Sequence, residues 1–210
     1  MRILAVAICY SVVAEAAISA DHPAIDAVAT ASYALFDDMP ALKPVPRIEG
    51  TCGADAHVHP QMAYCTSANA ILIHKDAERS PVAGYELAHL MGHAVQVRHG
   101  VADIALREIR RRPLEEAKLR GWVTSQVECI AGFLYNAAGG RAFDLEAAYT
   151  SEPFTGSHWG RNPLSKGPRV SIGTAARQHW FDLGLKGDLG ACAPGAFSAD
   201  LLLEALIPTQ

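Results

Sequence analysis

Two histidines and a glutamate near the middle of the 210-residue chain have the types and spacing that metal binding requires. They are Glu86, His89 and His93, within the stretch YELAHLMGHAVQVRHG. Residues three and four positions apart lie on the same side of an α-helix, so both imidazoles can reach one ion and the Glu86 carboxylate lies beside them. The stretch therefore predicts a pair of metal-binding imidazoles with a carboxylate nearby.

The residue after the first histidine decides what chemistry such a pair can support. In the motif His-Glu-x-x-His, two imidazoles bind zinc and the glutamate takes a proton from the zinc-bound water. Leu90 occupies the position of that glutamate in this sequence. Leucine cannot accept a proton, and loss of a general base typically lowers the rate by about 10² to 10⁴. The sequence therefore predicts a motif that keeps its histidines and lacks its base.

The composition is that of a folded chain with one core, and it argues against several classes of function. Hydrophobic residues make up 50% of the sequence and charged residues 19%, which does not indicate disorder. The net charge of -4 argues against a nucleic-acid partner, and we interpret the short basic run at 107–112 as a solvated helix face. The sequence contains no glycine-rich phosphate loop, no G-x-S-x-G elbow and no dinucleotide fingerprint.

The N-terminal residues have the pattern of an export signal. One arginine precedes an apolar run at 3–14, and small residues follow at 16–20. The run is too short for a comfortable membrane span. We therefore expect residues 1–20 to be a signal peptide and the protein to be periplasmic or extracellular. The alternative is that this segment is retained and anchors the protein to a membrane.

The cysteines favour the same oxidising compartment. Four cysteines follow the N-terminal segment, and four cysteines permit three pairings. Cys52 and Cys65 flank a short loop and form the natural first pair, and a bond between Cys129 and Cys192 would tie a central helix to the C-terminal segment. Such disulfides would stabilise a small fold by a few kcal/mol each. Buried free thiols are the alternative.

Periodicity and helix-breaking residues predict the elements that must position the two histidines. Residues 21–38 predict a short helix, and three prolines within 39–50 predict an extended connector. A strand is predicted over 68–74, followed by the histidine-bearing helix, which begins near Ser80 and stops near Gly100. Further helices are predicted over 102–112, 114–138, 173–188 and 198–206, and irregular chain over 150–170.

Several stretches, in the same order, resemble the neutral zinc metallopeptidases, a family of exported or membrane-anchored bacterial proteins. YELAHLMGHAVQ resembles that family's Y-x-x-A-H-E-x-G-H-H-V-Q, and SQVECIAGFLY resembles E-L-Q-A-D-C-x-A-G. CGADA with the later YC, ILIHKD and GTAARQHWFDLGLKGDLGAC are similar to its cysteine segment, edge strand and G-[ST]-x-x-x-R-x-x-W-F-x-x-G segment. The resemblance implies an α+β, zincin-like (gluzincin-type) single domain, mainly helical with a small sheet and braced by disulfides.

The resemblance also implies how the chain is divided. The zincin-like domain occupies residues 51–197. It is preceded by the signal peptide or anchor at 1–20 and by an N-terminal helix with a proline-rich connector at 21–50, and it is followed by a tail helix at 198–210.

Position by position, the resemblance implies that His89 and His93 are the zinc-binding histidines. Leu90 stands at the position of the catalytic glutamate, and Thr124 stands where the family has its third, carboxylate ligand. Glu128 stands where an aspartate supports a histidine, and it is also a candidate third ligand one helical turn from the lost one. Zinc sites almost always use at least three protein ligands, so we expect zinc binding to be weak or absent.

The joint loss of base and ligand implies an exported metallopeptidase-like protein without catalytic activity, a pseudo-peptidase. It would bind a protein or peptide partner or have a structural role. The alternative is a divergent zinc metallopeptidase in which Glu128 or Glu86 replaces a lost glutamate; otherwise Glu86 supports an imidazole by a hydrogen bond. A third hypothesis is a two-histidine site that holds a metal for structural purposes. A membrane partner is expected only if the N-terminal segment is retained.

Overall fold

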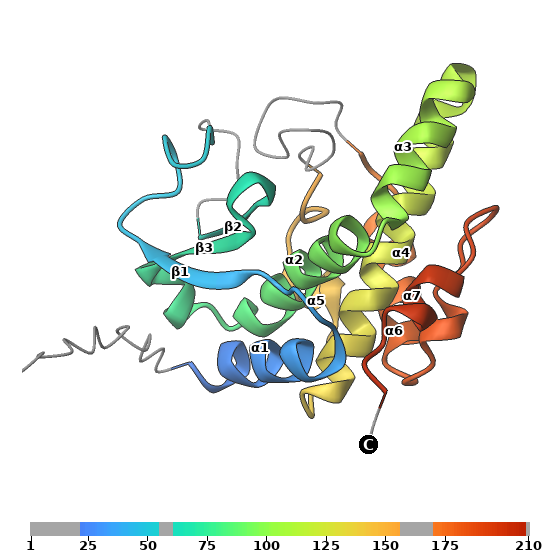
Figure 1. The fold of residues 1–210 in the computed structure, drawn as a ribbon. Coiled ribbons are helices and arrows are strands. Elements are labelled where there is room, and N and C mark those ends of the chain that lie inside the picture. The colour runs from blue at the N-terminus through green and yellow to red at the C-terminus, as the bar shows by residue number, and fades with distance from the viewer. Residues whose placement is uncertain (1–21, 55–60, 156–169, 209–210) are drawn as a thin grey trace, which may run out of the picture.

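The structure is a computed structural model, and it describes residues 22–54, 61–155 and 170–208. Over these residues the chain forms seven α-helices, four short 3-10 helices and one three-stranded sheet. Figure 1 shows the sheet on one side of the molecule, α1 below it, and the remaining long helices at the centre and on the other side. The mixed class predicted from the sequence, mainly helical with a small sheet, is confirmed.

The N-terminal part supplies a helix and an edge strand. Helix α1, Pro23–Leu35, begins with a proline in its first turn, where no backbone donor is lost. The predicted extended connector contains strand β1, Ala41–Val45, which pairs in parallel with β3. Pro44 is tolerated there because β1 is at the edge of the sheet, where a missing backbone donor breaks no ladder. The expected signal peptide at 1–20 lies outside the described residues.

The sheet has the strand order β1-β3-β2. The predicted strand over 68–74 is present as β3, Ala70–His74, after a 3-10 turn at Thr66–Ala68. Its antiparallel partner β2, Met62–Cys65, is buried along its whole length and was not predicted. Strand β2 has only four residues, and polar and apolar residues do not alternate along it. Periodicity alone therefore does not identify it as a strand.

Helix α2, Ala83–Arg98, is the central element of the fold. Of its 16 residues, 14 are buried, and the helix packs against α1, α4 and β2. Helix α3, Val101–Arg111, follows after Gly100, whose positive φ of 80° suits a glycine between two helices. A 3-10 turn at Pro113–Glu115 then leads into α4, Glu116–Ala137. The histidine helix and both predicted helices after it are thereby confirmed.

The C-terminal part closes the core. Short helix α5, Leu145–Ala148, precedes α6, Thr174–Gly184, which packs along α4. Helix α7, Asp200–Glu204, is shorter than the predicted tail helix, and a bridge between Phe36 and Leu206 ties the end of the chain to the end of α1. The end of the expected irregular segment, 156–169, lies outside the described residues.

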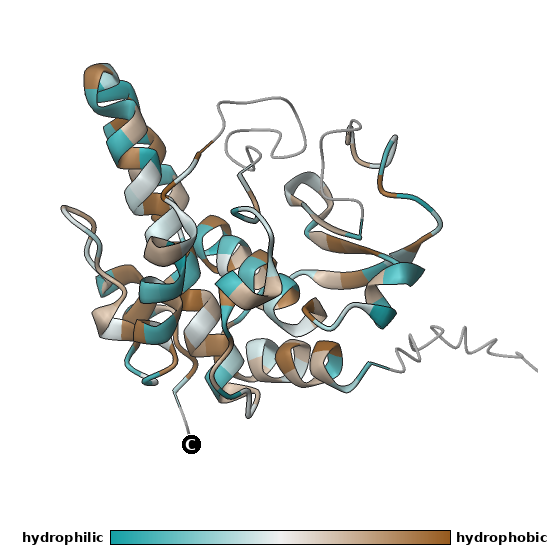
Figure 2. Cartoon of the chain, turned by 180° about the vertical axis from the view of Figure 1, so that it is seen from behind, coloured by the Kyte–Doolittle hydropathy of each residue, from teal (hydrophilic) through white to brown (hydrophobic). Residues whose placement is uncertain are grey.

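Two disulfides brace this arrangement, and they join the pairs expected from the sequence. Cys52–Cys65 links the loop after β1 to the end of β2, and Cys129–Cys192 links α4 to the C-terminal segment, with Cα–Cα distances of 6.1 and 5.4 Å. Figure 2 shows both hydrophobic and hydrophilic residues on the projecting part of the molecule, which is formed by α3 and the start of α4. None of the helices in the described part of the chain is long and apolar enough to cross a membrane.

Candidate functional site

The two histidines lie side by side on α2, as their spacing predicts. Their ring centroids are 4.8 Å apart, and His89 and His93 are only 1% and 5% exposed. Leu90, at the position of the general base, is 2% exposed and belongs to the apolar core. The helix therefore places the two imidazoles together, and the residue at the position of the base packs in the core.

Glu128 on α4 supports His89. Its Oε1 lies 3.2 Å from His89 Nδ1, and both side chains are almost completely buried. The Tyr85 hydroxyl donates a hydrogen bond to Glu128 Oε2 over 3.1 Å. Burial by itself would raise the pKa of the Glu128 carboxyl, but His89 and Arg177 together lower it below its ordinary value. Glu128 is thus an ionised carboxylate with both oxygens engaged.

Arg177 on α6 supplies the charge that keeps Glu128 ionised. It is fully buried, and its Nη1 donates to Glu128 Oε1 while its Nε donates to Glu152 Oε1 over 2.7 Å. Glu152 also accepts the backbone N–H of Ile172 over 3.0 Å and the hydroxyl of Ser171. A buried arginine between two carboxylates forms charge-assisted hydrogen bonds, which are among the stronger ones in proteins. The network therefore joins α4, α6 and the segment before residue 156.

That same segment covers one face of His89. The Phe154 ring stacks on the imidazole with centroids 4.0 Å apart and the planes only 6° from parallel. Arg177 donates a hydrogen bond from Nη2 to the Phe154 carbonyl over 3.4 Å, which ties this residue to the ionic network. Phe154 has a positive φ of 53°, a conformation that non-glycine residues rarely adopt. Tertiary contacts thus hold this aromatic ring against the histidine.

Glu86 is also buried, at 2% exposure, and it accepts a hydrogen bond from the Tyr149 hydroxyl over 3.3 Å. Burial, and then the Glu86 carboxylate, raise the pKa of Tyr149 above its ordinary value. The support of an imidazole by Glu86 stays a prediction, while Glu128 lies beside His89. The proposal that Glu86 replaces a lost glutamate stays a prediction.

The crossing of α2 and α4 shows where Thr124 lies. The Gln96 side chain donates to the Val123 carbonyl over 3.3 Å, two turns along α2 from the contact between His89 and Glu128. Antiparallel helices in this register bring Thr124 opposite His93. Thr124 is 6% exposed, so the residue at the position of the expected third ligand is buried and carries a neutral hydroxyl.

These donors do not fit the three-ligand zinc site that the resemblance implies. The candidate third ligands are the neutral hydroxyl of Thr124 and the carboxylate of Glu128, whose oxygens are engaged by Arg177 and Tyr85. Within the described ranges, no group of three or more His, Cys, Asp or Glu side chains is arranged to hold a metal ion. Structural and catalytic zinc sites almost always have at least three protein ligands.

Sequence reasoning missed five members of the site, which are Tyr85, Tyr149, Glu152, Phe154 and Arg177. Tyr85 and Arg177 both stand within the stretches that carry the resemblance, where the motif letters Y and R gave a signal that they matter. Glu152 lies in the segment predicted to be irregular, where no periodicity marks it. Only the fold brings Tyr85 and Arg177 to Glu128, from 43 and 49 positions away along the chain, and brings Glu152 to Arg177.

Comparison of the chain with protein-family models, with curated proteins and with solved structures finds no match. The resemblance to the neutral zinc metallopeptidases therefore stays a prediction from the sequence motifs.

Proposed function

We propose that this chain is an exported, metallopeptidase-like protein without peptidase activity, which binds a protein or peptide partner. The observation that carries the proposal is the state of Glu128. Its carboxylate is held by Arg177, Tyr85 and His89 inside the core. Both oxygens of Glu128 are thus engaged by protein partners that join α2, α4 and α6.

Leu90 and Thr124 support the same proposal independently. Hydrolysis by a zinc-bound water needs a base near the metal and a shell of ligands that keeps the metal in place. Leu90 is packed in the apolar core, and Thr124 offers a hydroxyl that is a weaker zinc ligand than a carboxylate. Both requirements of the reaction are therefore unmet by the residues at those positions.

Export is part of the proposal because of the two disulfides. Stable disulfides form in oxidising compartments and are rare in the reducing cytosol. Cys52–Cys65 and Cys129–Cys192 use all four cysteines that follow the N-terminal segment. The apolar pattern at 3–14 then supplies the export signal that such a protein requires.

A second candidate function, a zinc site that uses the two histidines, is favoured by one observation. The contact between Glu128 and His89 Nδ1 is 3.2 Å long, and carboxylates in this position orient zinc-binding histidines in many proteins. In such a site the other nitrogen of His89 and a nitrogen of His93 would bind the metal. A side chain beyond those described, or water, would complete the coordination.

Metal content distinguishes the two candidates. The oxidised protein is dialysed against micromolar zinc and then against buffer, and retained zinc is measured by elemental analysis for the wild type and for His93→Ala. We expect far less than one zinc ion per chain, with no difference between the two proteins, and no hydrolysis of labelled casein. About one zinc ion per chain, lost in the variant, would establish the second candidate instead.

A further inference from the structure

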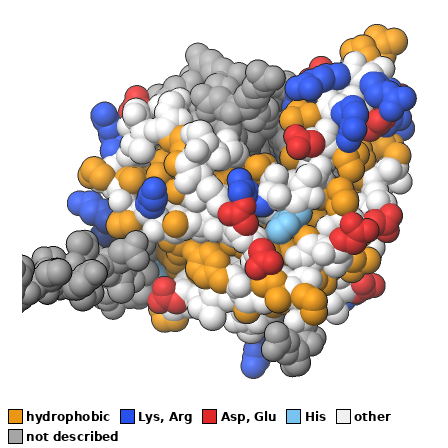
Figure 3. Space-filling view, in the orientation of Figure 1, with side chains coloured by type: hydrophobic (Ala, Val, Ile, Leu, Met, Phe, Trp, Pro, Cys, Tyr) orange, Lys and Arg blue, Asp and Glu red, His pale blue; other side chains and the backbone are white. Residues whose placement is uncertain are grey.

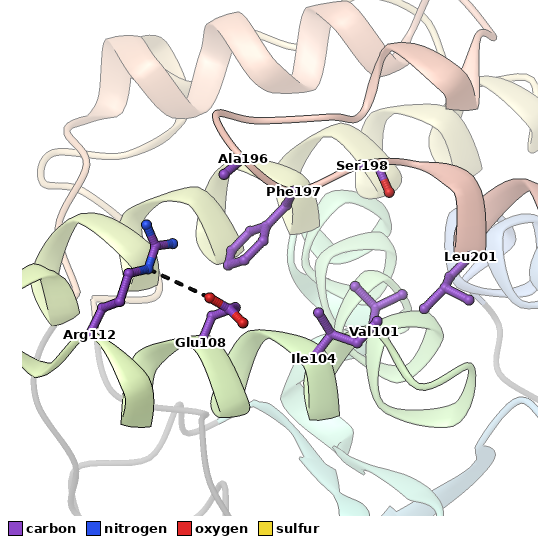
Figure 4. Close-up of a pocket in the computed structure, with 8 residues that line it drawn as sticks. All are labelled: Val101, Ile104, Glu108, Arg112, Ala196, Phe197, Ser198 and Leu201. Atoms are coloured by element: carbon purple, nitrogen blue, oxygen red, sulfur yellow. Dashed lines mark ion pairs between the residues drawn. The ribbon is translucent and has the colours of Figure 1, made fainter.

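A groove lies between α3 and the C-terminal segment, on a different surface from the histidine site. It has a volume of about 280 Å³. Figure 4 shows its lining side chains, which come from one face of α3 and from the residues before and within α7. We call this feature the α3 groove, and it is lined by Val101, Ile104, Glu108, Arg112, Ala196, Phe197, Ser198 and Leu201.

The floor and one end of the α3 groove are apolar and open to solvent. Ile104 is 39% exposed although it is a large hydrophobic residue, and Leu201 is half-buried. Phe197 and Val101 are 8% exposed, so they lie deeper and form the floor. The apolar surface is thus recessed between two chain segments, where it can receive an inserted side chain.

A basic rim runs along the outer side of the groove. At about 3.6 residues per turn, the α3 residues that line the groove form one stripe, and Arg107 and Arg111 lie beside that stripe on its solvent side. Both arginines are exposed. Figure 3 shows Lys and Arg side chains gathered at the projecting end of α3.

The rim keeps a positive charge because the four arginines of the run 107–112 outnumber the acidic residues beside them, Asp103, Glu108 and Glu115. Glu108 lies 3.1 Å from Arg111 and 3.6 Å from Arg112. Arg107 has no acidic partner among the residues that the structure describes. Four arginines against one glutamate leave the run 107–112 with a charge of +3, in a chain whose net charge is -4. The local charge is therefore opposite in sign to that of the whole molecule.

We propose that the α3 groove binds an acidic amphipathic segment of a partner protein. Its apolar side chains would enter the groove beside Ile104 and Phe197, and its carboxylates would meet Arg107 and Arg111. The volume is slightly below the range of small-molecule pockets, which starts at about 300 Å³, and suits one or two anchoring side chains. Apolar anchors between charged flanks are the usual way in which a helical peptide binds a groove.

The recessed position of the apolar residues favours a protein over a lipid surface. Apolar contact with a bilayer requires side chains that protrude, whereas Phe197 and Val101 lie at the bottom of the groove. Leu114, fully exposed in the turn between α3 and α4, is the side chain that would insert into a membrane. Leu114 does not line the groove, so a substitution at Leu114 distinguishes a membrane from a protein partner.

Selection from a displayed library of random peptides of about twelve residues tests the proposal on the full oxidised chain. We expect the selected peptides to combine Asp or Glu with Leu, Ile or Phe at helical spacing. Fluorescence anisotropy should show that Ile104→Asp weakens peptide binding at least about tenfold. The double variant Arg107→Glu with Arg111→Glu should weaken it by a similar factor, and this effect should be largest at low salt. Selected peptides that lack acidic residues, or that bind Ile104→Asp unchanged, would overturn the proposal.

Leu114→Asp is the matched control, because it also replaces an exposed apolar residue by aspartate, in the turn that follows α3. We expect it to leave peptide binding unchanged, and melting temperatures of all variants check that they are folded. Binding to phosphatidylserine vesicles that is lost in Leu114→Asp and kept in Ile104→Asp would assign the basic rim to a membrane and overturn the proposal. The inference goes beyond the proposed function, and zinc content and peptidase assays are independent of the groove, so the two can fail separately.

Discussion

Glu128 contacts both the histidine motif of α2 and the buried arginine of α6. It lies beside His89, as a supporting carboxylate in a metal site does, yet it is also the main partner of the buried Arg177. Each of these contacts lowers the pKa of the Glu128 carboxyl, and together they outweigh the effect of burial. The charge of this residue therefore couples the histidine helix to the stability of the whole core.

The pH dependence of stability should report this charge. The pKa values of Glu128 and Glu152 are both lowered in the folded protein, so the unfolded chain binds protons at higher pH than the folded one. Their contribution is complete above the unfolded pKa of about 4.3 and is lost as the pH falls through the folded values. We expect stability in urea to fall below about pH 4, and to fall less steeply in Glu128→Gln. Equal slopes in the two proteins would contradict the assignment.

Thr124 offers a gain-of-function test at the residue scale. Because the resemblance places Thr124 at the position of the third ligand, Thr124→Glu would restore a carboxylate there. We expect this variant to retain about one zinc ion per chain after dialysis, while the wild type does not. The matched control is Thr124→Gln, which has nearly the same shape but lacks the charge. Peptidase activity should require Leu90→Glu in addition, since the base is still missing.

At the scale of elements, the contact between α4 and α6 sets how Arg177 reaches Glu128. Gly132 on α4 and Gly184 on α6 allow the two backbones to touch, and a Cβ at either position would collide with a backbone carbonyl of the other helix. This approach brings Arg177, two turns before Gly184, onto the carboxylate. The two glycines are therefore required by packing, although a glycine in a helix interior is intrinsically unfavourable.

Alanine at these glycines should separate the helices. We expect Gly132→Ala and Gly184→Ala to lower the free energy of unfolding by about 1–3 kcal/mol or more, as overpacking does in other cores. Gly121→Ala, on the same helix α4, is the control, because its Cβ would meet the Ile172 side chain at an ordinary distance of 3.4 Å. That variant should be neutral, or more stable by up to about 1 kcal/mol from helix propensity. Denaturation in urea measures all three variants.

At the scale of the whole molecule, the two disulfides close loops of very different length. Cys129–Cys192 spans 63 positions and joins the central helix α4 to the C-terminal segment, whereas Cys52–Cys65 spans only 13. Cys129 and Cys192 are fully buried, and Cys52 is half-buried. The longer bridge therefore holds the fold together, and the shorter one fixes a loop beside the sheet.

The stability of variants without each bridge should follow loop length. The chain-entropy relation gives about 4 kcal/mol for a loop of this length at Cys129–Cys192 and about 3 kcal/mol at Cys52–Cys65. We expect Cys129→Ala with Cys192→Ala to lower the melting temperature more than Cys52→Ala with Cys65→Ala. Brief treatment with a mild reductant should open the accessible Cys52–Cys65 bridge first, which mass spectrometry after thiol alkylation detects. The reverse order in either measurement would contradict this assignment.

The sequence by itself determined the features that depend on local spacing. The positions of His89 and His93 four residues apart place them on one face of a helix whatever the rest of the chain does, and Leu90 removes the base from that motif. Helix-breaking prolines and glycines marked most helix boundaries to within a few residues. The cysteines permitted three pairings, and the short spacing of Cys52 and Cys65 favoured the pairing that the structure shows.

Tertiary structure alone decided what surrounds the histidines. Arg177 meets both Glu128 and Glu152, and Phe154 stacks on His89, because α6 packs on α4 and the chain before residue 156 folds back onto the core. The connector became an edge strand because β3 offered free backbone groups to pair with. Such contacts join residues tens of positions apart, and their free energy depends on burial and on the geometry of the partners. Periodicity along the chain predicts neither the burial of these residues nor the geometry of their partners.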